Sequence, residues 1–248
     1  MIPAKLIYRY FLFVFIVLFL SLHGMQIHSQ QLPTNHKTTA QARTEITAFK
    51  IDSILSLMTL KEKISMCHAQ SQFSSPGIPR LGIPELWMSD GPHGIRAEIN
   101  WSNWGYSGWT NDYITAFPAL TCLSATFNPS LSKQYGVSIG EEARYRKKDV
   151  LLGPGVNIYR TPLNGRNFEY MGEDPYLASR MVVPYIKGVQ MNGVAACVKH
   201  FALNNQELWR NHINVQVSDR ALYEIYLPAF EAAVKEGESW SNGGLQSI

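Results

Sequence analysis

The sequence predicts an α/β protein, an incomplete TIM-like (β/α)8 barrel that is truncated before its last strands. Three short apolar runs, at 86–88, 150–152 and 194–198, have the composition of buried strands. Segments with helical patterns separate them, and this alternation favours a parallel sheet. The polar residues suited to binding or catalysis come directly after these strands. That placement favours a barrel over a doubly wound sheet, because barrels carry their chemistry at the carboxyl ends of strands.

Four segments carry helix signals. A capping box begins the segment 60–69, and an Asn-Pro pair begins 128–139. The segment 175–190 has an uninterrupted helical pattern. The segment 218–237 is capped at its start, interrupted by a proline and ended by a glycine. No Gly-rich phosphate loop follows any of the strands, which argues against a nucleotide-binding protein.

Composition excludes several other classes. The net charge is +3, and the basic residues are scattered, so nothing indicates a nucleic-acid partner. The three cysteines, Cys67, Cys122 and Cys197, form neither a disulfide framework nor a zinc motif, and we expect buried thiols. The pattern calls for no metal and no organic cofactor.

The first residues have the pattern of an export signal. Lys5 and Arg9 give a basic start, and the apolar run at 11–22 is short for a membrane span. We therefore expect a signal peptide over 1–30, a flexible lead over 31–44, and a periplasmic or extracellular folded part. The alternative is an uncleaved N-terminal anchor.

Three constellations stand out. The loop Asp90-Gly-Pro-His-Gly-Ile-Arg96 presents a carboxylate and a guanidinium from a rigid turn, although such a sequence in isolation is more often a surface turn. In the segment 165–175, Arg166 and Glu169 have the spacing of an ion pair, and a salt-bridged loop explains them equally well. Lys199 and His200 end an apolar strand, where a buried charge needs a partner.

Aromatic residues gather beside the first constellation. Four of the six tryptophans fall between Trp87 and Trp109. Such a cluster lines a carbohydrate site or belongs to a core, and the composition favours neither.

Taken together, the ordered segments resemble the N-terminal barrel of glycoside hydrolase family 3, in its β-glucosidase-like branch. The matching stretches are 87–96, 152–157, 165–175, 199–205 and 222–235, and they cover most of 46–237. The resemblance implies retaining hydrolysis of terminal β-linked glucose from oligosaccharides or polysaccharides. It also implies a set of residues that line the subsite for that sugar: Asp90, Arg96, Arg166, Lys199, His200 and Arg210.

The two catalytic carboxylates that retaining hydrolysis needs are not among these residues. By the resemblance, the nucleophilic Asp and the acid/base lie beyond residue 248. None of the other acids, including Glu169, Glu173 and Asp174, is assigned to either role. We interpret 45–237 as the N-terminal part of the barrel. The segment 238–248 is interpreted as an aberrant tail without a strand, from a frameshift or premature stop, and the chain alone is expected to be inactive.

Three other functions compete with this interpretation. A β-xylosidase or arabinofuranosidase of the same family is the nearest, and the Asp90 loop favours glucose over it. An N-acetylhexosaminidase is disfavoured because Ala202 and Leu203 follow Lys-His-Phe where that branch has Pro-Gly. The last alternative is a non-catalytic sugar-binding or inactive fragment. The oligomeric state and the aglycone stay open.

Overall fold

A computed structural model describes residues 49–109, 112–238 and 240–243. The chain divides into two compact units, 1–56 and 57–248. Of the first unit the structure describes only 49–56, which is helical. The expected signal peptide and flexible lead lie outside the described residues. Within the described part, no helix is long and apolar enough to cross a membrane.

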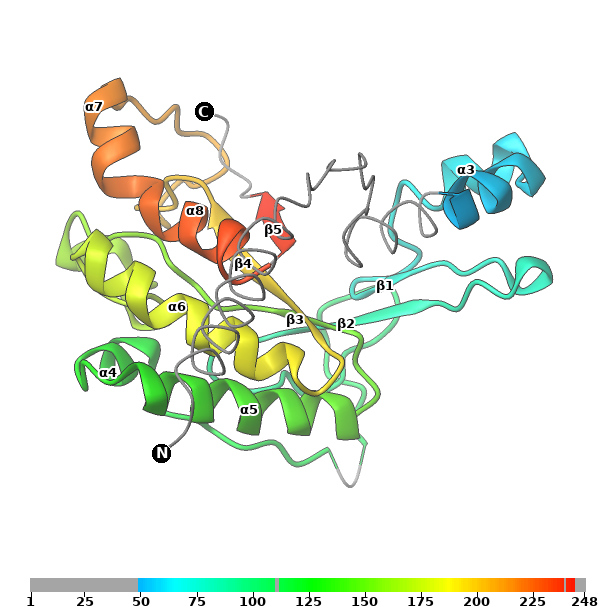
Figure 1. Ribbon diagram of the computed structural model, residues 1–248, viewed down its shortest axis with the longest axis horizontal. Coiled ribbons are helices and arrows are strands. Elements are labelled where there is room, and N and C mark those ends of the chain that lie inside the picture. The colour runs from blue at the N-terminus through cyan, green and yellow to red at the C-terminus, as the bar shows by residue number, and fades with distance from the viewer. Residues whose placement is uncertain (1–48, 110–111, 239, 244–248) are drawn as a thin grey trace, which may run out of the picture. The chain divides into compact units, whose positions relative to one another are not determined.

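The second unit is built on a mixed five-stranded sheet whose strands follow chain order (Figure 1). The strands are β1 (Ser74–Ser75), β2 (Leu86–Asp90), β3 (Val150–Leu152), β4 (Ala195–Phe201) and β5 (Trp240–Gly243). β1 pairs antiparallel with β2, whereas the pairs β2–β3, β3–β4 and β4–β5 are parallel. The α/β class is confirmed, and the antiparallel edge strand β1 is an addition to it.

Helices connect the parallel strands, as the alternating pattern predicts. They are α4 (Leu120–Ser124), α5 (Pro129–Tyr145), α6 (Pro175–Gln190), α7 (Asp219–Ala221) and α8 (Pro228–Lys235), whereas α3 (Leu60–Ser65) precedes the sheet. A π-helical turn, Leu222–Tyr226, joins α7 to α8, and 3-10 turns occur at Pro79–Leu81, Pro162–Asn164 and Asn167–Glu169. The expected caps are present, because the side chains of Thr59, Asn128 and Ser218 each accept a backbone N–H of the first turn.

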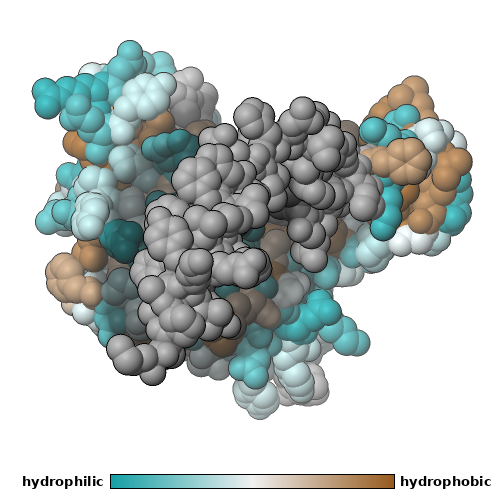
Figure 2. All heavy atoms as spheres, viewed as in Figure 1, coloured by the Kyte–Doolittle hydropathy of each residue, from teal (hydrophilic) through white to brown (hydrophobic). Residues whose placement is uncertain are grey.

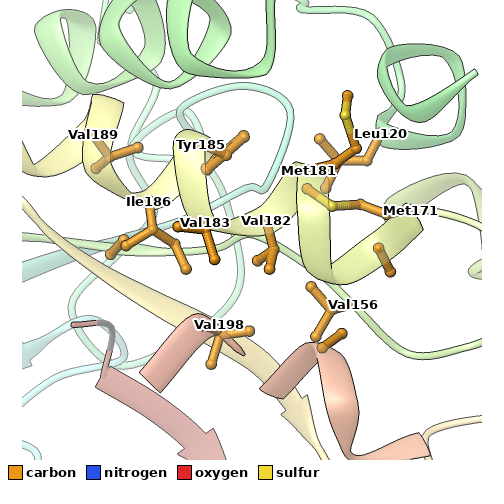
Figure 3. Packing of buried hydrophobic residues seen from close by; sticks show 14 of the residues in the cluster. Leu120, Val156, Met171, Met181, Val182, Val183, Tyr185, Ile186, Val189 and Val198 are labelled. Carbon is orange, nitrogen blue, oxygen red and sulfur yellow. The ribbon is translucent and has the colours of Figure 1, made fainter. Parts of the chain in front are cut away.

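The core lies between α6 and the sheet. Met181, Val182, Ile186 and Val189 of α6 are fully buried. Val182 and Ile186 point toward the strands, where Val198 of β4 faces them, whereas Met181 points toward Leu120 of α4 (Figure 3). Burying each such side chain contributes roughly 1.5–3 kcal/mol. This packing fixes the strand ends that carry the polar residues.

Glycines let α5 and α6 approach closely. A Cβ on Gly136 would lie 2.1 Å from the backbone oxygen of Tyr185, and one on Gly188 would lie 2.4 Å from that of Lys133. No side chain fits at either position, since real Cβ contacts are longer. α6 is thereby held between α5 and α8 in the layer of helices (Figure 1).

Two expectations about the strands were wrong. β4 continues to Phe201 instead of ending at Val198, so Lys199 and His200 belong to the strand itself. The tail is not devoid of a strand, because β5 pairs parallel with β4 over Cys197↔Trp240 and Val198↔Ser241. An unpaired strand edge offers a row of free N–H and C=O groups, and four residues with weak strand propensity are enough to pair with it.

Helix α3 exposes apolar side chains. Its capping box between Thr59 and Glu62 is complete, and Arg80 holds the same carboxylate. Leu60 and Ile64 are nevertheless exposed, and apolar residues are visible on the surface of this region (Figure 2). The helix ends at Ser65, four residues before the expected end at Ala69, so local capping alone sustains fewer than two turns.

The cysteines follow the expectation only in part. All three are free, but Cys67 and Cys122 are exposed and Cys197 alone is buried. The expectation of three buried thiols was wrong for the first two, since Cys67 lies in the turn after α3 and Cys122 lies on an exposed position of α4.

Candidate active site

The first pair of predicted residues meets across the sheet. Asp90 ends β2 and Lys199 lies in β4, with β3 between them. Lys199 Nζ donates to Asp90 Oδ1 at 2.5 Å, and the lysine side chain is only 3% exposed. Arg96 Nη1 lies 3.6 Å from the other carboxylate oxygen. Burial raises the pKa of Asp90, but Lys199, the backbone N–H of Gly91 and Arg96 together lower it by more, so the net pKa is below the ordinary value.

A tight turn holds Asp90 and Arg96 together. The backbone N–H of Gly91 donates to Asp90 Oδ1 at 3.0 Å, and that of Arg96 donates to the carbonyl of Asp90 at 3.0 Å. Gly91 has φ +120°, and a Cβ there would lie 1.8 Å from the oxygen of Gly94. Only glycine permits this return of the chain.

Arg96 is also held by aromatic rings. Its guanidinium carbon lies 5.3 Å from the ring centroid of Trp104 and 6.0 Å from that of Phe73, and these two rings meet edge to face. Cation–π contacts of this kind favour an ordered guanidinium. One tryptophan of the predicted cluster thus borders the site. Trp101 instead packs edge-on against Trp87, at 5.9 Å between centroids.

Arg166 joins two groups. It donates from Nε and Nη2 to the two carboxylate oxygens of Glu169, both at 2.8 Å, which confirms the predicted pair. Its Nη2 also lies 3.1 Å from His200 Nε2. Although burial lowers the pKa of Arg166, Glu169 raises it more, and the guanidinium stays charged.

His200 is fixed on every side. Its backbone N–H donates to Asn157 Oδ1 at 2.7 Å, and its carbonyl accepts from Asn157 Nδ2 at 3.0 Å. Its Nδ1 lies 3.0 Å from the hydroxyl of Tyr170. Burial, and then the charges of Lys199 and Arg166, lower the pKa of His200 to about 2, so the ring is neutral at ordinary pH.

Arg210 reaches the site through an acid that the sequence reasoning did not select. Arg210 Nη1 donates to Glu207 Oε2 at 3.0 Å, and Glu207 Oε1 lies 3.6 Å from Arg166 Nη1. Asn204 also donates to Glu207 Oε1, at 3.2 Å. All six predicted residues thereby belong to one contiguous set of contacts, in which Lys199 and His200 are neighbours on β4.

Four residues of this network were missed as site residues: Asn157, Tyr170, Asn204 and Glu207. Glu207 was within reach of sequence reasoning, since it lies three residues before Arg210 and three after Asn204. Asn157 follows a buried strand, which is the same signal that selected Asp90. Nothing in the local sequence distinguishes Tyr170 from an ordinary core tyrosine.

Two cavities differ in whether predicted residues line them. A pocket of about 290 Å³ lies at the Asp90 loop and is lined by Asp90, His93, Arg96 and Thr115. A larger, mostly apolar pocket of about 910 Å³ lies by α4 and the start of α6 and includes none of the six residues. We place the site at the smaller pocket because Asp90 and Arg96 line it, and the other four predicted residues lie outside its lining. Across the described ranges, no three His, Cys, Asp or Glu side chains are grouped to hold a metal ion.

These strand-end charges on an α/β sheet define a site suited to a polyhydroxylated ligand. A model of the glycosyl hydrolase family 3 N-terminal domain matches residues 23–240, and the chain belongs to this family. It is 76% identical over 192 residues to beta-glucosidase BoGH3A of Bacteroides ovatus, covering 77% of this chain and 26% of that protein. It is 43% identical over 185 residues to an exo-alpha-(1->6)-L-arabinopyranosidase of Bifidobacterium longum, covering 74% of this chain and 24% of that one.

The solved structures agree. Beta-glucosidase 3B of Thermotoga neapolitana in complex with glucose has a TM-score of 0.69 at 39% identity, over 79% of this chain and 30% of that one. DesR, a beta-glucosidase of Streptomyces venezuelae in complex with D-glucose, has a TM-score of 0.67 at 40% identity, over 77% and 24%. The chain spans about a quarter of the length of the curated relatives it matches.

Proposed function

We propose that the described residues form the glycone-binding half of an exo-acting β-glucosidase site. The observation that carries this proposal is the pairing of Asp90 with the buried Lys199 at the strand ends, joined to Arg96, Arg166, His200 and Arg210 in one network. The carboxylate accepts hydrogen bonds from vicinal hydroxyls, and the cations donate. The relatives named beta-glucosidases, two of them solved with glucose, support the same sugar.

The sheet fits a (β/α)8 barrel, which is part of the proposal. Four parallel strands follow one another in chain order without a reversal, and a doubly wound sheet would reverse its order. Helices lie between successive parallel strands, and the polar residues gather at the carboxyl ends, as in barrel enzymes.

The chemistry proposed is retaining hydrolysis, in which two carboxylates flank the glycosidic bond. The acids of this network are engaged in other pairs. Asp90 binds Lys199, Glu169 binds both nitrogens of one edge of Arg166, and Glu207 binds Arg210. We therefore assign these residues to holding the sugar and propose that nucleophile and acid/base come from other parts of the enzyme. The 248 residues alone then bind sugar without hydrolysing it.

A second candidate is an α-L-arabinopyranosidase. It is favoured by the 43% identity to exo-alpha-(1->6)-L-arabinopyranosidases of two Bifidobacterium species. The β-xylosidase alternative rests on the family resemblance alone. Both pentoses lack the hydroxymethyl group of glucose, so a direct comparison of sugars separates the candidates.

Calorimetry on the purified chain tests the proposal. We expect glucose to bind more tightly than xylose or arabinose, and we expect Asp90→Asn to weaken glucose binding by at least tenfold, since hydrogen bonds to a charged group contribute about 1.5–3 kcal/mol. Equal binding of all three sugars, or wild-type affinity in Asp90→Asn, would contradict the glucosyl site. Release of p-nitrophenol from its β-glucoside by this chain would contradict the division of roles.

Export is a separate proposal. It rests on the basic start and the apolar run within 1–30. Expression with a C-terminal tag, followed by fractionation and N-terminal sequencing, tests it. A full-length chain in the cytoplasm would contradict it.

A further inference from the structure

A further polar cavity is lined by none of the six residues of the proposed sugar site. Its volume is about 480 Å³, and its lining comes from three segments: 160–161 after β3, 203–206 after β4, and 213–216 before α7. A cavity of this size falls within the range of small-molecule sites. We call it the amide cavity, after its polar lining residues: Arg160, Thr161, Asn205, Gln206, Asn214 and Gln216.

The side chain of Asn205 has an acceptor without a donor. The residue is 8% exposed, and its Nδ2 donates to the carbonyl of Ile158 at 2.6 Å, which fixes the orientation of the amide. Its Oδ1 is buried, and nothing in the described part of the chain donates to it. A buried carbonyl oxygen without a hydrogen bond costs free energy. A ligand that donates at this wall of the cavity removes that cost.

The turn after β4 directs two consecutive asparagines to different partners. Leu203 has φ +65°, a left-handed conformation that is unfavourable for a leucine. Asn204 then donates to the Tyr170 hydroxyl, which belongs to the network of the proposed sugar site. Asn205 instead donates to Ile158 and lines the amide cavity. Strained residues of this kind cluster at ligand sites, and this turn borders both the network and the cavity.

The polar lining suits an uncharged ligand that is rich in hydroxyl groups. Four of the side chains are amides, which both donate and accept hydrogen bonds, and Thr161 adds a hydroxyl. Arg160 is the one charged side chain that the described residues contribute to the lining. An anion has no hydrogen to donate to Asn205 Oδ1. A sugar hydroxyl, in contrast, accepts from the guanidinium and donates to the amide oxygen.

The rest of the lining is aliphatic. It consists of Leu203, Ile213 and Val215. A pyranose ring has C–H groups on its faces and hydroxyl groups at its edge. Binding sites for such ligands combine apolar side chains with a few placed polar groups, and the amide cavity has both.

We propose that the amide cavity is a second saccharide site, which holds a neutral sugar unit of an oligosaccharide without cleaving it. The proposal goes beyond the glycone site, since Asp90 and Lys199 take no part in it. The described residues place no acid in the lining, so they supply binding and no proton transfer there. Because three separate segments form the lining, a saccharide of several units contacts more of it than a single glucose does.

Methyl NMR of the isoleucine-labelled chain tells the two sites apart. Ile213 lines the amide cavity and Ile95 lines the pocket at the Asp90 loop, and a valine substitution at each position identifies its signal. We expect cellotriose, a β-linked glucose trimer, to shift the Ile213 signal at an at least about tenfold lower concentration than glucose does. In Asp90→Asn/Lys199→Met, Ile213 should respond as in the wild type, while the response of Ile95 weakens at least about tenfold.

The two signals separate failure of this proposal from failure of the proposed function. A shift of Ile95 alone would overturn the second site and leave the glycone site intact, and a shift of Ile213 alone would do the reverse. An Ile213 shift that disappears in the double variant would overturn the proposal, because it would then be transmitted from the Asp90 loop. A response of Ile213 to inorganic phosphate but not to cellotriose would assign Arg160 to an anion instead.

Alanine variants of exposed amides test the lining without disturbing the fold. Asn214→Ala and Gln216→Ala each remove an exposed side chain of the cavity, and each should weaken the cellotriose response of Ile213 about three- to tenfold. Gln134→Ala is the matched control, because Gln134 is an exposed amide on α5 and does not line the cavity. The same cellotriose affinity in all three variants would overturn the proposal.

Discussion

Lys199 and Asp90 are 109 positions apart in the chain, and Lys199 Nζ donates to Asp90 Oδ1 at 2.5 Å. The contact crosses from β4 to the end of β2. Its two partners differ in exposure, since the lysine side chain is 3% exposed and the aspartate 31%. The pair therefore neutralises a buried ammonium group, while the partly exposed aspartate can still offer an oxygen to a ligand.

Asp90→Asn should destabilise the fold as well as weaken glucose binding by at least tenfold. It leaves the ammonium of Lys199 buried without its closest counter-charge, which costs about 3 kcal/mol. Urea denaturation of the purified chain measures this loss. The double variant Asp90→Asn/Lys199→Met removes both charges and should regain most of the stability, while glucose binding stays at least tenfold weaker than in the wild type. A single variant as stable as the wild type would show that the pair does not hold the strand ends.

Much of the fold was predictable because its signals are local. The capping residues Thr59, Asn128 and Ser218 act on the first turns that the sequence assigned to them. The β3 strand has its predicted bounds, because Val150–Leu152 is a short apolar run that ends at glycine and proline. The extension of β4 to Phe201 was not predictable, because Lys199 is buried only by a partner from a distant strand.

The site was predictable as a set of residues but not as a set of contacts. The six residues came from family-like motifs, and each motif is a contiguous segment. Glu207 was within reach through its spacing to Arg210, whereas Tyr170 was missed because its role depends on a partner 30 positions away. A single sequence carries no signal for such contacts, since a buried tyrosine that meets a histidine has the same local pattern as one that meets a leucine.

The stability of the chain should fall as pH decreases below about 6.5, and His200 should account for part of it. In the folded chain burial and neighbouring cations lower its pKa to about 2, whereas the unfolded ring has a value near 6.5. Between these values only the unfolded state takes up the proton, so the free energy of unfolding decreases as pH falls, by about 2 kcal/mol between pH 6.5 and pH 5.

Denaturation of wild type and His200→Gln at pH 7, 6 and 5 measures this contribution. The sign follows from the depressed folded pKa of a base, since the stabilisation is complete above the unfolded value and is lost toward the folded one. The stability difference between the two proteins should shrink by about 2 kcal/mol from pH 7 to pH 5. A pH-independent difference would mean that His200 takes up its proton in the folded chain.

Glu207→Gln should loosen both guanidinium groups. Glu207 lies 3.0 Å from Arg210 and 3.6 Å from Arg166, so it separates two like charges. Neutralising it should destabilise the chain by about 1–2 kcal/mol and weaken glucose binding, because the two arginines then repel each other. Glu224→Gln is a matched control, since its pair with Arg220 is exposed and such pairs contribute little. Equal unfolding midpoints for the two variants would contradict the bridging role.

Trp104→Ala should weaken sugar binding with little effect on stability. Trp104 is 59% exposed, yet its ring lies under the guanidinium of Arg96, which in turn lies 3.6 Å from the Asp90 carboxylate. Removing a cation–π contact at an exposed site costs about 0.5–1 kcal/mol, so glucose affinity should fall about two- to fivefold. Trp101→Ala is the control, because Trp101 is similarly exposed but packs against Trp87 instead of Arg96. If calorimetry gave the two variants the same affinity, Trp104 would be a surface tryptophan and Arg96 would owe its position to the Asp90 turn alone.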